Sequence, residues 1–245
     1  MDFNIKDLQF FSIHEIKPEY WFRSIQPNDS TPTPEQRREM IRIIDERVKI
    51  NSEGLNIVYN NCKLSKQGSP EYQKINHVLN NLFFYIYQTT SDCMVASKNY
   101  LLADQDYEKR YARGKLRVIL NEGFKNLYGF PQTKKSKTYW GELSTIMNHF
   151  PGLDRQYQMI GTILENQSKQ SSWWKHERDL EVHLEPIKLF ESRQEELNES
   201  KVMVDTIQLL DALGIVEQFV GNLHASLTNW LNSLYLRHPE YFKGE

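Results

Sequence analysis

The chain has little cysteine and no long apolar run. Only Cys62 and Cys93 occur among 245 residues, too few for a disulfide framework and not spaced as a C-x-x-C metal pair. No stretch of ~18 apolar residues is present, and the start, MDFNIKDLQF, lacks the basic region and apolar run of a signal peptide. We therefore expect a cytoplasmic protein with reduced thiols and no membrane partner.

The chain also lacks an excess of charge of one sign. Its 30 basic and 32 acidic side chains give a formal net charge of −2, so binding to nucleic acid would require a local patch. Neither a glycine-rich phosphate loop nor a G-x-S-x-G nucleophile elbow is found. The 39% hydrophobic residues suffice for a sizeable core.

Helix signals dominate the first half of the chain. Thr33 and Gln36 form a capping box around Pro34, and apolar residues then recur every three or four positions. The same pattern of a cap followed by proline recurs at Ser69. These signals predict long helices over 34–64, 70–101 and 104–128, the last ended by Gly129 and Pro131.

The second half predicts shorter helices over 138–149 and 154–168 and a long one over about 200–236. The last helix carries an apolar seam with spacings of three and four, formed by Leu209, Leu213, Val216, Val220, Leu223, Leu227, Trp230 and Leu234. Such a seam requires a facing helix, from the same chain or from a second copy.

These elements predict an all-α fold, a helical bundle of three or four long helices with shorter helices added. Residues 1–33 are rich in aromatics without helical periodicity, and we expect them to form an arm packed on the bundle. Residues 34–245 are then a single helical domain. A short strand over 8–13 is the only competing signal.

The segment 173–186, WWKHERDLEVHLEP, combines chemically useful side chains. Asp179 and His183 are four residues apart and can touch on a helix, whereas Arg178 and His183 would point about 140° apart. Pro186 removes a backbone donor and clashes with the preceding turn. The helix is therefore expected to kink or end near His183, where a long Arg side chain can curl round.

The sequence Arg178-Asp179-x3-His183 resembles the R-x4-6-H motif of the HEPN superfamily, all-α bundle proteins in which a polar residue often follows the Arg. The resemblance covers six residues and the helical setting. It implies a homodimer with two motifs in one cleft, and an endoribonuclease that needs no metal or cofactor. It also implies a toxin, antiphage defence or RNA-processing setting, in which an antitoxin or another partner protein is possible.

The residue types suit RNA cleavage. Attack by the 2′-hydroxyl needs proton transfer at two oxygens, and a histidine such as His183 is suited to both. The planar fork of Arg178 can hold phosphate oxygens and stabilise charge on the phosphorane. Asp179 would fix the imidazole tautomer or extend the arginine. Trp173 and Trp174 are candidates for base stacking, although Trp173 lies on the apolar face.

A metal site is an alternative use of the same segment. His176, Asp179 and His183 lie on one helical face and offer imidazole and carboxylate ligands. Further ligands would have to come from elsewhere, for instance His149 or Glu122. We assign no metal ligand and no cofactor, because a partial ligand set without a recognised spacing is usually structural.

Three structural or binding alternatives also remain. The motif can be a solvated helix end, and the whole chain can be a non-catalytic module that uses the 209–234 seam as its dimer or partner interface. A basic stripe at 107–117 is either a phosphate-tracking surface or, as we prefer, a solvated helix face; it holds Lys109, Arg110, Arg113 and Arg117. We interpret the basic run of Lys134, Lys135 and Lys137 as a charged loop.

Overall fold

The computed structural model describes residues 33–64, 69–170 and 199–237, and these ranges contain helices and no strand. The predicted all-α bundle is therefore confirmed. Four helices are long: α1 (Pro34–Leu64), α2 (Pro70–Leu102), α3 (Asp106–Leu127) and α8 (Glu199–Arg237). The others are α4 (Tyr139–Leu143), α5 (Asp154–Gln170) and the 3-10 turns η2 (Lys135–Lys137), η3 (Met147–His149) and η4 (Pro151–Leu153). The expected arm and the competing strand over 8–13 lie outside the described residues.

The predicted helix starts of α1 and α2 are confirmed by their hydrogen bonds. The Thr33 amide donates to Gln36 Oε1 at 2.8 Å, and the Gln36 amide donates to Thr33 Oγ1 at 3.2 Å. Before α2, Ser69 Oγ accepts from the Tyr72 amide at 3.2 Å. These side chains satisfy amide groups that have no partner inside the helix.

Two glycines shape the turn between α3 and α4. Gly129 has a φ of 85°, a conformation that favours glycine, and its amide donates to the Phe124 carbonyl at 3.0 Å. Gly141 lies so close to the backbone that an added Cβ would be 1.9 Å from the Lys135 oxygen. The chain can therefore fold back tightly after α3.

The predicted helix over 138–149 is wrong in its length. The α-helix ends at Leu143, and turns and the 3-10 helix η3 follow. The amides of Thr145 and Ile146 bond to carbonyls three residues back, and Ser144 Oγ donates to the Gly141 carbonyl at 2.6 Å. These hydrogen bonds to carbonyls three residues back replace the bonds to carbonyls four residues back that an α-helix would have.

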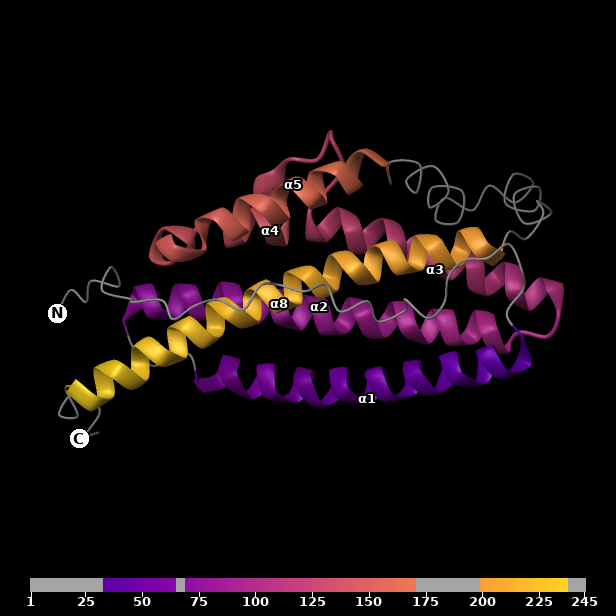
Figure 1. Cartoon of the computed structure of the whole chain (residues 1–245), viewed down its shortest axis with the longest axis horizontal. Coiled ribbons are helices and arrows are strands. Elements are labelled where there is room, and N and C mark those ends of the chain that lie inside the picture. Colours follow the sequence, from indigo (N-terminus) through magenta and orange to yellow (C-terminus); the bar gives the residue numbers. More distant parts are fainter. Residues whose placement is uncertain (1–32, 65–68, 171–198, 238–245) are drawn as a thin grey trace.

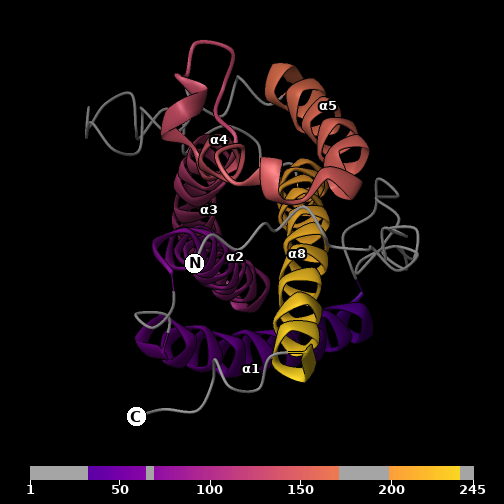
Figure 2. The same cartoon turned by 90° about the vertical axis from the view of Figure 1, so that its left-hand side faces the viewer.

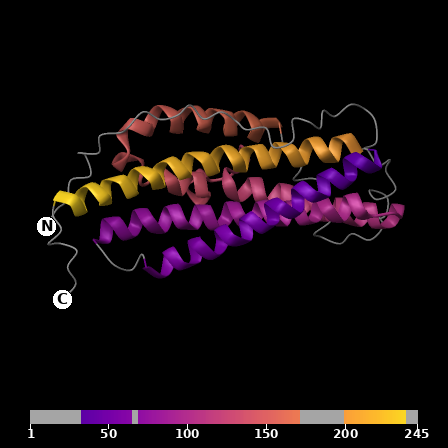
Figure 3. The same ribbon diagram turned by 60° about the horizontal axis from the view of Figure 1, so that its bottom comes forward.

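The long helices form an elongated bundle with α2 at its centre (Figure 1). Helix α2 contacts α1, α3 and α8, while α5 contacts α8. Figure 2 shows α1 on one side of the bundle and α4 and α5 on the opposite side. Figure 3 shows α1 crossing the bundle obliquely.

The apolar seam of α8 is buried inside this chain. Its members from Leu209 to Leu227 are at most 2% exposed: Leu209, Leu213, Val216, Val220, Leu223 and Leu227. Their neighbours are α2, α3 and α5. The seam thus finds its facing helices within one copy of the chain, and this part of it is covered before any partner binds.

The composition raised expectations about membrane-spanning helices and about the two cysteines. None of the helices in the described ranges combines the length and apolar character needed to cross a bilayer. Cys93 is fully buried in the core, as expected, whereas Cys62 is only partly buried.

The buried seam leads to a stability prediction. Leu223→Ala should lower the free energy of unfolding by about 2–5 kcal/mol, because it removes buried methyl groups and leaves a cavity. Chemical denaturation measures this change. Leu236→Ala, at a leucine of the same helix that is 80% exposed, should change it by less than about 0.5 kcal/mol; equal effects would contradict the packing described.

Candidate functional site

The motif residues Arg178, Asp179 and His183 lie outside the described residues, as do Trp173, Trp174 and His176. The structure describes the helices on either side, since α5 ends at Gln170 and α8 begins at Glu199. The convergence of Arg178 and His183 on one ligand therefore remains a prediction.

The two helices that flank this segment are bonded to each other. Gln167 Nε2 donates to the Gln208 carbonyl at 2.6 Å, and Ile160 and Leu164 of α5 are fully buried. Ser168 is also fully buried, and its hydroxyl has no hydrogen-bond partner among the described residues. The last turns of α5 are thus held firmly against the bundle before the chain enters the motif segment.

The basic stripe of α3 is divided between two faces of the helix. Arg113 and Arg117 are only 5% and 9% exposed, so the preferred interpretation of a solvated face is wrong for both. Lys109 and Arg110 are half-buried. Residues four apart share a helical face, which places both buried arginines on the side that faces the interior.

The interior row on α3 continues with Asn121, which is 2% exposed and whose Nδ2 has no hydrogen-bond partner in the described part of the chain. Gly123 lies against Leu209 of α8, and α3 and α8 run in the same direction (Figure 1). Asp205, one helical turn before Leu209 on α8, is also buried. A buried guanidinium requires polar partners, and Arg113 and Arg117 both have interaction partners.

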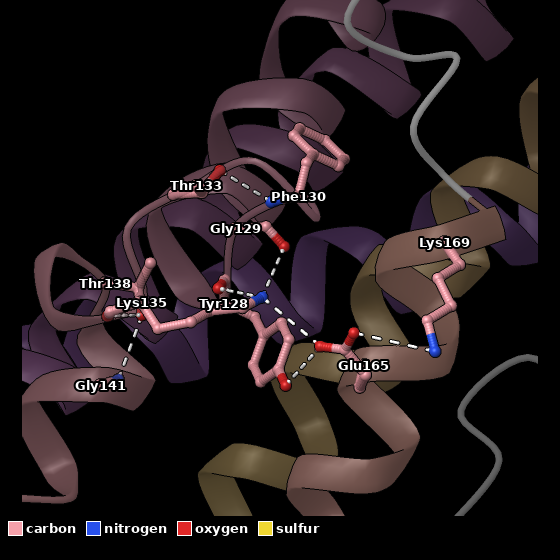
Figure 4. A network of polar contacts seen from close by, with 9 residues as sticks. All are labelled: Tyr128, Gly129, Phe130, Thr133, Lys135, Thr138, Gly141, Glu165 and Lys169. Carbon is pink, nitrogen blue, oxygen red and sulfur yellow. Dashed lines mark hydrogen bonds and ion pairs between the residues drawn. The ribbon is translucent and has the colours of Figure 1, made fainter.

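A second polar cluster, the Lys135 clasp, joins the end of α3 to α5 (Figure 4). It consists of Tyr128, Gly129, Lys135 and Glu165. Lys135 Nζ donates to the Tyr128 and Gly129 carbonyls at 3.2 and 3.4 Å, and it lies 3.6 Å from the centre of the Tyr128 ring. The carbonyls belong to the C-terminal end of α3, where a cation is favoured by the helix dipole.

Glu165 completes the clasp from α5. It accepts from the Tyr128 hydroxyl at 2.9 Å, and its carboxylate is 3.7 Å from Lys135 and 3.8 Å from Lys169. The hydrogen bond from Tyr128, together with both lysines, holds the pKa of Glu165 below its ordinary value. Burial lowers the pKa of Lys135, and Glu165 opposes that shift. The clasp is a satisfied structural contact, because its ammonium group already has several partners.

Sequence reasoning missed the Lys135 clasp by treating this lysine as part of a charged loop. The pattern Gly129-Phe130-Pro131 after α3 predicts that the helix ends in a turn. It does not predict which residue Lys135 contacts. Glu165 is 30 positions further along the chain. A contact of this kind depends on how α5 packs, and no local pattern encodes it.

The alternative of a metal site receives no support from the described ranges. They hold no group of three or more His, Cys, Asp or Glu side chains placed to bind a metal ion. His149 Nδ1 lies 3.3 Å from Glu71, and Glu122 lies 3.3 Å from Lys125. Both suggested extra ligands thus have other neighbours.

Comparison of the chain with protein-family models, with curated proteins and with solved structures found no match.

The Lys135 clasp predicts a pH-dependent contribution to stability. Because the pKa of Glu165 is lowered from 4.5, its ionised form stabilises the folded state above that pH, and this stabilisation is lost as the pH falls through the lowered pKa. Glu165→Gln should therefore cost less than about 1 kcal/mol near neutral pH, since the site is partly exposed. Denaturation of both proteins from neutral to acidic pH measures the difference, which should disappear in acid; a constant difference would contradict an electrostatic origin.

Proposed function

We propose that this protein is a HEPN-like, metal-independent endoribonuclease. The observation that carries the proposal is the sequence Arg178-Asp179-x3-His183, followed by Pro186, in a chain whose described part is all-α. The bond between Gln167 and Gln208 supports it, because flanking helices that are bonded to each other help to position a reactive segment between them.

In the proposed reaction, His183 accepts the proton of a ribose 2′-hydroxyl while that oxygen attacks the adjacent phosphorus. The bond from phosphorus to the 5′-oxygen breaks, and that oxygen receives a proton from a protonated imidazole, leaving a 2′,3′-cyclic phosphate and a 5′-hydroxyl. Arg178 stabilises the charge on the phosphorane. Asp179 orients the imidazole or the guanidinium.

The wider setting is part of the same proposal. Two copies would form a homodimer that brings two motifs together, and RNA would be the substrate. We place the protein in the cytoplasm, in a toxin, antiphage defence or RNA-processing system with a possible antitoxin or other partner protein. Because the seam residues from Leu209 to Leu227 are buried within one copy, these side chains would not form the dimer contact.

The nuclease proposal predicts that His183→Ala and Arg178→Ala each reduce RNA turnover by ~10² or more, because each removes proton transfer or charge stabilisation. Cleavage should persist in EDTA. Labelled single-stranded RNA and tRNA, analysed on denaturing gels, provide the measurement.

Matched controls are available on the described surface. His77→Ala replaces an exposed histidine of α2, and Arg42→Ala replaces an exposed arginine that pairs with Glu39 and Glu46. Both should retain full turnover. Loss of cleavage in EDTA would reject the metal-independent mechanism, and full activity of His183→Ala would reject the assigned role of the motif.

A non-catalytic binding module is the alternative. It would retain binding to its protein or nucleic-acid partner after His183→Ala and would show no turnover. Because most of the α8 seam is covered within the chain, such a module would have to use another surface.

A further inference from the structure

An apolar pocket lies at the end of the bundle where α1 begins. Its described lining residues come from α1, α2, α3 and α8, and Figure 1 shows that α2 ends and α8 begins at this same end. Met40 of α1 and Met94 of α2 line the pocket and are 5% and 4% exposed. Met203 and Ile207 of α8 also line it but are only partly buried. The α8 side of the pocket is therefore accessible to a further apolar group.

The chemistry of the lining indicates what kind of group fits. Three of the chain's six methionines lie here, namely Met40, Met94 and Met203. Methionine side chains are flexible and polarizable, so they adapt to an irregular partner, and their sulfur atoms make favourable contacts with aromatic rings. Among the described residues, none of the lining side chains carries a charge. The pocket therefore favours an aromatic or aliphatic occupant.

The stretch that precedes α1 contains such groups. Residues 1–32 hold six aromatic side chains, a larger share than the 12% of the whole chain. Their last apolar group before α1 is the run YWFRSI, residues 20–25, which the polar, proline-containing run QPNDSTP follows. Large aromatic side chains contribute to stability chiefly when they are buried. Residues 20–25 are thus the apolar part of the expected arm that is nearest to the pocket along the chain.

We propose that residues 20–25 dock on this apolar pocket, with Trp21 and Phe22 packed against Met203 and Ile207. Phe22 is 11 residues before Thr33, and an extended chain of that length spans up to ~36 Å. Met40 lies seven residues after Thr33, about 10 Å along the helix axis. The linker of residues 26–32 is therefore long enough to bring the aromatic rings back to the pocket.

The connection between α5 and α8, residues 171–198, is the other part of the chain with apolar groups to offer, because α8 begins beside the pocket. This connection leaves α5 on the opposite side of the bundle from α1 (Figure 2). The arm instead leads directly into α1, and Met40 is the first buried residue after Thr33. Continuity with a helix that lines the pocket favours the arm as its occupant.

The test is a double-mutant cycle on the full-length protein, measured by chemical denaturation. Trp21→Ala and Met203→Ala should each lower the denaturation midpoint. The double substitution should lower it by less than the sum of the two shifts, because loss of either side chain already removes their contact. Trp21→Phe should retain most of the midpoint, since an aromatic ring remains to pack against the methionine.

Two control cycles use the same readout. Leu223 lies 20 residues after Met203 on α8, about 30 Å along the helix axis, so the shifts of Trp21→Ala and Leu223→Ala should add. The shifts of Trp173→Ala and Met203→Ala should also add, because Trp173 belongs to the connection that the proposal excludes from the pocket.

Photocrosslinking locates the arm without relying on stability. A benzophenone side chain introduced at position 22 of the full-length protein should crosslink, within one chain, to residues 203–210 of α8 or 40–44 of α1, as identified by mass spectrometry.

Three results would each overturn the proposal: additive shifts for Trp21 and Met203, crosslinks confined to other parts of the chain, or a covalent dimer. The dimer would mean that the arm of a second copy fills the pocket. The docking of the arm is independent of RNA cleavage, so its failure would leave the proposed nuclease standing, and a protein without nuclease activity could still show the coupling and the crosslinks.

Discussion

The packing of the α8 seam is the constraint on which the rest of the structure depends. Its buried side chains contact α2, α3 and α5, so one helix connects the centre of the bundle with its added layer. Phe219 of α8 extends this packing to both added helices. The centre of its ring lies 5.9 Å from that of Trp140 in α4 and 6.2 Å from that of Tyr157 in α5. The position of α5, and with it the start of the segment that carries the motif, follows from burial along α8.

Polar groups inside the bundle give this apolar packing its register. Arg47 of α1 bonds to Glu217 of α8 at 2.5 Å, with both side chains largely buried. Burial raises the pKa of Glu217, and Arg47 opposes the rise. A charged pair tolerates displacement less than two apolar faces do, because a shifted partner leaves a buried charge unsatisfied. Sliding of α1 along α8 would break this bond.

The features that could be predicted from the sequence are those encoded locally. The caps at Thr33 and Ser69 and the stop at Gly129 gave correct helix boundaries because each depends on a few neighbouring residues. The Lys135 clasp and the burial of Arg113 depend on contacts between distant helices, so local patterns could not reveal them. The motif around His183 remains a prediction from residue types and from a family resemblance.

The segment 107–117 shows why composition misled us and why structure matters for function. In the linear sequence, basic and aromatic residues alternate without separation in YEKRYARGKLR. Folded into α3, it separates into a buried row with Arg113 and Arg117 and an exposed row with Tyr107 and Tyr111. The two arginines are buried in the interior, where a guanidinium requires polar partners. Substituting them would report on folding, and only the exposed row can report on what the helix binds.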